Sequence, residues 1–202
     1  MTELCFNSAV TTILKQWSQS GDRHAQVVKR TRHLFDLLVA VGTQVDCPQV
    51  KYLQTKHDLL TLVRPIPHAV FYFARYHGDY VGLSFSSHEQ QINDNRAVAN
   101  ALEQLQKLRM DTLPLFDWPP LRDFFGAAPS DEALLLDTLT TLQATRFKRN
   151  ISIADMAWRM ALTEAQLAKV ERVDAVPSIA TLQRYAVALD LSLDLRVDGQ
   201  MR

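Results

Sequence analysis

Polar side chains that can bond with nucleic-acid bases gather in one short segment near the end of the sequence. Gln166, Lys169 and Arg172 carry hydrogen-bond donors, and Glu164 carries acceptors. In the major groove of DNA, an amide can pair with adenine, a cation can donate to guanine, and a carboxylate can accept from the amino group of cytosine. These residue types therefore indicate a surface that contacts base edges or phosphates, if one helix presents them together.

Two short helices, over residues 153–160 and 164–172, are predicted to position these side chains. Ser152 and Thr163 are of the residue type that caps the beginning of a helix. Ala161-Leu162 is expected to turn the chain between the two helices. Such a pair would leave the beginning of the second helix exposed, where it can enter a major groove.

The order of small, apolar and capping residues around this pair resembles the phage-repressor (Cro-type, XRE) helix-turn-helix family. The resemblance covers residues 133–197, and it is carried by Ala157, Leu162, Thr163, Val170-Glu171-Arg172 and Pro177-Ser178-Ile179-Ala180-Thr181-Leu182. It implies a homodimer on operator DNA, with half-sites about one helical turn apart. The DNA-binding residues that it implies are Ser152, Thr163, Glu164, Gln166, Lys169 and Arg172. The family often has glutamine at the positions of Ile153 and Glu164.

Further helices are predicted on both sides of this pair. One runs from Ser130 or Asp131 to about Phe147, and another covers residues 179–189. The last of these is expected to bury Ile179, Leu182, Tyr185, Ala186 and Leu189. Because apolar and polar residues alternate from Leu191 to Val197, a final short strand is predicted there.

The earlier part of the sequence predicts an α+β domain with an antiparallel sheet. Helical spacing of apolar residues predicts helices that contain Ala9–Trp17 and end at Val41, and a further helix over 95–108. Strands are expected at 4–6, 59–63, 68–76 and 80–85, with a hairpin turn at His77-Gly78-Asp79. The predicted organisation is an α+β domain over 1–110, a proline- and aromatic-rich connector over 111–130, and an all-α helix-turn-helix domain over 131–202.

Residues 24–108 resemble the RelE/HigB toxin superfamily. The resemblance is carried by Cys47–Leu53, Leu60–Arg64, His68–Phe73, Val81–His88 and Arg96–Leu108. In HigB–HigA pairs the toxin is encoded before a helix-turn-helix antitoxin, which is the order of the two resemblances in this chain. The family's members are ribosome-dependent endoribonucleases, whose chemistry needs a proton acceptor, a proton donor and cations around the phosphate.

That second resemblance implies two groups of site residues. The catalytic candidates are Arg64, His68 and His88, and the RNA-binding candidates are Lys51, Lys56 and Arg75. Two of the family's catalytic motifs are substituted in this sequence. Ala69 stands where the family has an arginine in its second strand, and Ser87-His88-Glu89 stands where it has Lys-Lys-Thr.

Three hypotheses about function follow. The first is a DNA-binding transcriptional regulator of toxin–antitoxin type, whose RelE/HigB-like domain carries substituted catalytic positions. The second is an mRNA interferase that acts on the ribosome and is inhibited in cis by its fused antitoxin domain. The third is an interaction protein without enzymatic activity that binds a separate toxin, antitoxin or phage partner.

Composition restricts the partners without choosing among these hypotheses. The chain has 202 residues, with 22 basic and 22 acidic side chains, so any phosphate binding must come from local patches. Cys5 and Cys47 are expected to be reduced thiols, and neither a metal site nor a cofactor is predicted. No apolar run approaches the length of a membrane span. Met1–Phe6 lacks the basic and apolar pattern of a secretion signal, which favours a cytoplasmic protein.

Overall fold

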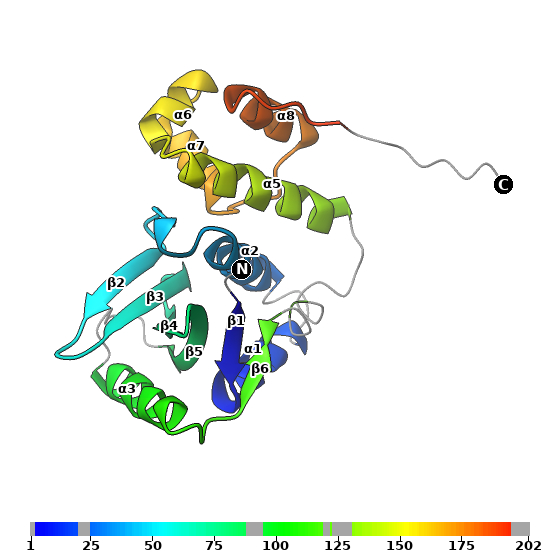
Figure 1. Ribbon diagram of the computed structural model, residues 1–202. Helices are drawn as coiled ribbons and strands as arrows, with labels where there is room; N and C mark the ends of the chain where they lie inside the picture. Colours follow the sequence, from blue (N-terminus) through cyan, green and yellow to red (C-terminus); the bar gives the residue numbers. More distant parts are fainter. Residues whose placement is uncertain (1–2, 20–24, 88–94, 119–121, 123–130, 195–202) are drawn as a thin grey trace. The chain divides into compact units, whose positions relative to one another are not determined.

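The computed structural model describes residues 3–19, 25–87, 95–118, 122 and 131–194. The chain divides into two compact units, residues 1–130 and 131–202 (Figure 1). The first unit contains a sheet and helices, and the described part of the second is helical. In chain order the elements are β1 (Leu4–Asn7), α1 (Ser8–Gln19), α2 (Ala25–Val41), the 3-10 turn η2 (Gly42–Gln44), β2 (Val50–Gln54), β3 (Leu59–Ile66), β4 (Ala69–Tyr76), β5 (Asp79–Ser86), α3 (Asn95–Arg109), β6 (Leu115–Asp117), α5 (Asp131–Lys148), α6 (Ile153–Arg159), α7 (Glu164–Glu171) and α8 (Ile179–Ala188).

The six strands of the first unit form one mixed sheet in the order β2-β3-β4-β5-β1-β6, within an α+β fold. The prediction of an antiparallel sheet is wrong for β1, which runs parallel to β5 and pairs Leu4 with Tyr80. Its other neighbour, β6, is antiparallel. Alternation of apolar residues can mark a strand, but it carries no information about the direction of a partner that lies 76 residues away.

Two strands were not expected from the sequence, and both lie at the edges of the sheet. β2 pairs with β3, and the middle of β2 is exposed. β6 has three residues, all of them exposed. Such short and exposed edge strands lack the apolar alternation by which a half-buried strand is recognised. The predicted hairpin is confirmed. His77 and Gly78 have φ of 52° and 99°, as a two-residue turn between antiparallel strands requires.

One face of the sheet packs against α1 and α2 through aromatic rings. Phe6 lies between Phe35 and Phe73, with ring centroids 5.3 and 6.0 Å away, and Trp118 completes the cluster at 5.7 Å. These rings leave no space at Gly82, because a Cβ atom there would lie 2.5 Å from the Phe6 ring. Trp118 also donates from Nε1 to the Asp36 carboxylate at 2.8 Å, so this one aromatic residue of the predicted connector packs into the core.

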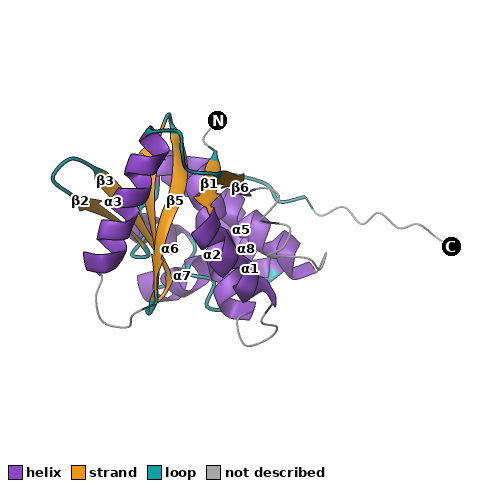
Figure 2. Ribbon diagram, turned by 90° about the horizontal axis from the view of Figure 1, so that it is seen from below, coloured by secondary structure: helices purple, strands orange, loops and turns teal. Residues whose placement is uncertain are grey.

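The other face of the sheet is covered by α3 over only part of its length. Figure 2 shows α3 beside the strands, on the side away from α1 and α2. The contacts of α3 include Leu60, Tyr72 and Ala74 from the strands and Ala101 and Leu105 from the helix. Asn100 in α3 donates to the Ser84 hydroxyl at 3.3 Å. The sheet end that holds Arg64 contains the pocket described below, whose wall includes Leu62 and Val70 from the same apolar cluster.

The second unit is built around an apolar core that α5, α6, α7 and α8 share. Met156, Leu167 and Tyr185 are fully buried in it. The expected burial of α8 is confirmed at Leu182, Tyr185, Ala186 and Leu189 and wrong at Ile179, which is 43% exposed. Ile179 is the first residue of α8, and the buried stripe of that helix begins one turn later, at Leu182.

The strand predicted at 191–197 is wrong over residues 191–194, which form no strand; residues 195–197 lie outside the described residues. α8 ends with Asp190 at φ 56°, and the Leu191 amide bonds back to the Ala186 carbonyl at 2.9 Å. This left-handed ending turns the chain back over the helix end. Leu193 then packs against the helical core, which explains the alternation that resembled a strand.

Candidate nucleic-acid interface

Side-chain caps begin both α6 and α7 in the second unit. The Ser152 hydroxyl accepts from the Asp155 amide at 3.0 Å and lies 2.7 Å from the Asp155 carboxylate, so it satisfies one of the helix's unpaired donors. Thr163 accepts from the Gln166 amide at 3.2 Å. Both residues are exposed, as expected, but their side-chain oxygens are engaged in starting a helix.

The turn between α6 and α7 is held by the backbone. Ala161 adopts φ 50°, and the Leu162 amide donates to the Ala157 carbonyl at 2.9 Å. Leu162 is half-buried and packs against the core, while Ala157 is buried beneath it. The end of α6 is also tied to α8, because Arg159 donates to the Ala188 carbonyl and Arg184 donates to the Met160 carbonyl. These bonds hold the end of α6 against α8, and the turn holds the start of α7 beside α6.

α7 exposes most of the side chains that the sequence assigned to DNA. Its buried side consists of Leu167 and Glu171, with Val170 half-buried beside them. The exposed side chains are those of Glu164, Ala165, Gln166, Lys169 and, at the helix end, Arg172. The geometry therefore places Glu164, Gln166, Lys169 and Arg172 on one short helix, with Thr163 at its start.

Two of these side chains already have partners within the unit. The Gln166 amide oxygen accepts from the Thr163 amide at 2.9 Å, which completes a reciprocal capping box. The Arg172 guanidinium lies 2.8 Å from the Asp174 carboxylate. Over the described residues, no hydrogen bond or ion pair engages the Lys169 ammonium or the Glu164 carboxylate.

Beneath α7 lies a buried polar network that the sequence interpretation missed. Arg146 of α5 forms an ion pair with Glu171 at 2.8 Å, with side chains only 3% and 5% exposed. Tyr185 of α8 donates to the same carboxylate at 2.8 Å, and Gln143 donates at 3.2 Å. Burial raises the pKa of Glu171, and its three partners oppose that rise. The sequence did contain a signal for this network. Glu171 is a charged residue on the same side of α7 as the apolar Leu167 and Val170, so burial of its carboxylate could have been expected.

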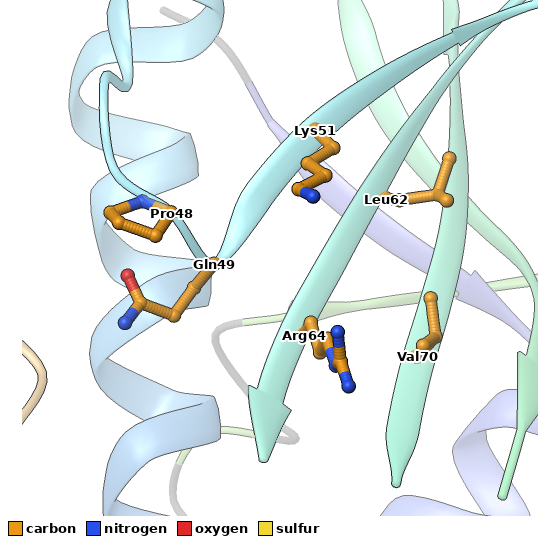
Figure 3. A pocket seen from close by; sticks show the side chains of 6 residues that line it. All are labelled: Pro48, Gln49, Lys51, Leu62, Arg64 and Val70. Carbon is orange, nitrogen blue, oxygen red and sulfur yellow. The ribbon is translucent and has the colours of Figure 1, made fainter. Parts of the chain in front are cut away.

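In the first unit, Lys51 and Arg64 line a shallow pocket at the end of the sheet (Figure 3). Lys51 pairs across the strands with Leu62, which forms part of the pocket wall together with Val70. Arg64 donates from Nε to the Pro67 carbonyl at 2.9 Å, so its guanidinium is held against the β3–β4 turn. Two cations beside an apolar wall could bind a phosphate group, while the wall contacts a base or another ring.

The remaining site residues predicted for RNA do not gather at this pocket. His68 is exposed in the β3–β4 turn, next to the carbonyl that holds Arg64. Lys56 lies in the β2–β3 turn, and Arg75 lies near the end of β4, where it bonds to the Gly78 carbonyl at 3.4 Å. Because Gln54 pairs with Leu59 and Leu60 pairs with Ala74, both of these cations lie at the opposite end of the sheet. His88 lies outside the described residues.

Other reactive groups offer little further chemistry. Burial and the neighbouring Asp117 raise the pKa of Cys5 to about 12, so its thiol stays protonated at neutral pH and is a poor nucleophile. Within the described ranges, no three His, Cys, Asp or Glu side chains group so that they could hold a metal ion. None of the helices in the described ranges has the length and apolar character needed to cross a membrane.

Comparison with known proteins returns no relative: no family model, no curated protein and no solved structure matches the chain.

Proposed function

We propose that the protein is a DNA-binding transcriptional regulator of toxin–antitoxin type, and that α7 enters the major groove of its operator. The observation that carries this proposal is the exposed face of α7, on which Lys169 projects outward. The helix is capped at its start by Thr163, and its buried side is bonded to α5 through the Glu171–Arg146 ion pair. An α-helix fits the width of the major groove, and a helix held at a fixed angle can place a side chain at a defined base pair.

The turn at Ala161-Leu162 supports the same interpretation. It brings α6 and α7 together at a closely packed crossing, where the buried Ala157 leaves room for the second helix. In DNA-binding proteins of this architecture, the first helix lies across the backbone and the second contacts base edges. We further propose a homodimer, because two-fold symmetric regulators place two such helices one helical turn apart on a palindromic site.

Substitution of Lys169 provides the test. In a mobility-shift titration with the duplex from upstream of the protein's own gene, Lys169→Ala is expected to weaken binding about 5- to 150-fold, the range for loss of one specific base contact. Lys148→Ala removes an exposed cation from the end of α5 and is the matched control, with binding expected to stay nearly unchanged. Equal losses in the two variants, or no shift with the unsubstituted chain, would contradict the proposal.

The pocket with Lys51 and Arg64 favours a second candidate function, ribosome-dependent mRNA cleavage restrained in cis by the second unit. We consider cleavage the weaker proposal, because general acid–base catalysis needs a donor and an acceptor that converge on one phosphate. Of the catalytic candidates, the structure describes Arg64 and His68, both at the β3–β4 turn. The Arg64 guanidinium is bonded to the Pro67 carbonyl, which leaves His68 as the one described candidate for proton transfer. The cations Lys56 and Arg75 lie at the far end of the sheet.

Ribosome-associated cleavage can be measured directly. Induced expression of the residues 1–130 fragment and of the full chain is expected to leave growth and mRNA 5′ ends, mapped by primer extension, unchanged. Arg64→Ala is the informative variant. Growth arrest with new mRNA ends that this substitution abolishes would establish the nuclease and remove the regulator as the primary function. If neither cleavage nor operator binding occurs, an interaction protein is the hypothesis that remains.

A further inference from the structure

The exposed side of α7 contains a stripe in which the side chains differ in their freedom to contact DNA. Ala165, Lys169 and Arg172 follow one another at intervals of four and three residues, so they lie along one face of the helix. This face is opposite to Leu167 and Glu171, which are buried in the unit. A base-reading surface on α7 would therefore be centred on this stripe.

Gln166 is exposed next to the stripe, but its amide oxygen is occupied. The oxygen accepts from the Thr163 amide at 2.9 Å and from the Thr163 hydroxyl at 3.2 Å, while the Gln166 backbone amide donates to that hydroxyl. Specific contact with adenine needs the same oxygen to accept from N6 while the amide nitrogen donates to N7. Gln166 cannot make this pair unless the capping box opens.

The two cations of the stripe also differ. The Arg172 guanidinium lies 2.8 Å from the Asp174 carboxylate, whose negative charge would have to approach the DNA together with it. The Lys169 ammonium is exposed and carries three donors, and no hydrogen bond or ion pair among the described residues engages them. Ala165, one turn before Lys169, offers a methyl group, which suits the C5 methyl of thymine.

We propose that Lys169 selects a guanine in each half-site, that Ala165 packs against the methyl of a neighbouring thymine, and that Gln166 is a positioning residue that fixes the start of α7 without contacting a base. This inference rests on the proposed DNA-binding function. It predicts that the base preference of the operator changes with Lys169 and is independent of the amide group of Gln166.

The test is an in-vitro selection from a randomised duplex library with the full chain and two variants. Lys169→Gln is expected to change the preferred base at one position per half-site from guanine to adenine, by roughly 5-fold or more in relative enrichment, because glutamine pairs bidentately with adenine. Gln166→Glu is expected to leave the selected motif unchanged. Glutamate at this helix position keeps the capping box but cannot donate to the N7 atom of a base.

The selected motifs, rather than affinities, are compared, since Gln166→Glu adds a negative charge that lowers affinity for every sequence. Circular dichroism of each variant confirms that the helices form. A motif that stays unchanged in Lys169→Gln, or that changes in Gln166→Glu, overturns this inference while DNA binding itself stands. If the unsubstituted chain enriches no motif, both this inference and the proposed function are overturned.

Discussion

Replacement of Glu171 by alanine is expected to destabilise the second unit by about 3–5 kcal/mol, the cost of removing one partner of a buried ion pair. The carboxylate accepts hydrogen bonds from Arg146, Tyr185 and Gln143, which come from α5 and α8. Without it, the Arg146 side chain, which is 3% exposed in the structure, would lose its counter-charge. The loss should therefore extend beyond α7 to both helices that contribute partners.

Hydrogen–deuterium exchange of the full chain measures this effect separately for each unit. Amides of α5, α7 and α8 are expected to exchange about 100-fold faster or more in Glu171→Ala, because their protection depends on the stability of the unit that contains them. Asp194→Ala, which removes an exposed acid of the same unit, is the control. A double variant, Arg146→Met with Glu171→Leu, should recover most of the protection, since an apolar pair can replace a buried ion pair. Unchanged exchange in Glu171→Ala would show that the network contributes nothing.

The second large effect is expected at Gly82 in the first unit. Gly82→Ala should lower the free energy of unfolding by about 1–3 kcal/mol, the usual cost of forcing an extra methyl group into a filled core. The new Cβ would lie 2.5 Å from Phe6 and 3.2 Å from Phe73. Phe6 is fully buried against Phe35 and Trp118, so its ring has little room to move away.

Urea unfolding followed by tryptophan fluorescence can detect this loss, because Trp118 is buried in the same cluster. In the background of Phe6→Leu, which removes the ring that the methyl meets, Gly82→Ala should cost much less. This non-additivity is expected for residues in contact. If the cost of Gly82→Ala is the same in both backgrounds, the clash with Phe6 is not its cause.

Local rules predicted most of the second unit from its sequence. Thr163 alone indicated a helix start, and the three-residue spacing of Leu167 and Val170 indicated the buried side of α7. The sequence could not show whether the polar atoms of an exposed side chain already have partners within the protein. Gln166 was therefore expected to be free for a base, and the structure shows its amide oxygen in the cap. The partners of Glu171 were equally hidden, because they come from helices 25 and 14 residues away.

In the first unit the sequence indicated strands but not their neighbours. β3, β4 and β5 were predicted from runs of apolar residues, whereas the parallel pairing of β1 depends on contacts between distant segments. The same limit applied to the RNA-binding candidates. Lys51, Lys56 and Arg75 are all exposed, but only the register of β2, β3 and β4 reveals that Lys51 lies at one end of the sheet and the other two lie at the opposite end.

Hydroxyl-radical footprinting of the full chain on its own upstream duplex is the most direct test of operator binding. We predict protected backbone positions in two groups whose centres lie about 10 base pairs apart or a multiple of that distance, as two copies of α7 in successive major grooves require. Protection should disappear in Lys169→Ala at concentrations where Lys148→Ala still protects. A pattern that covers the whole duplex uniformly, or no protection at all, would contradict the account of α7 as a sequence-specific DNA-binding helix.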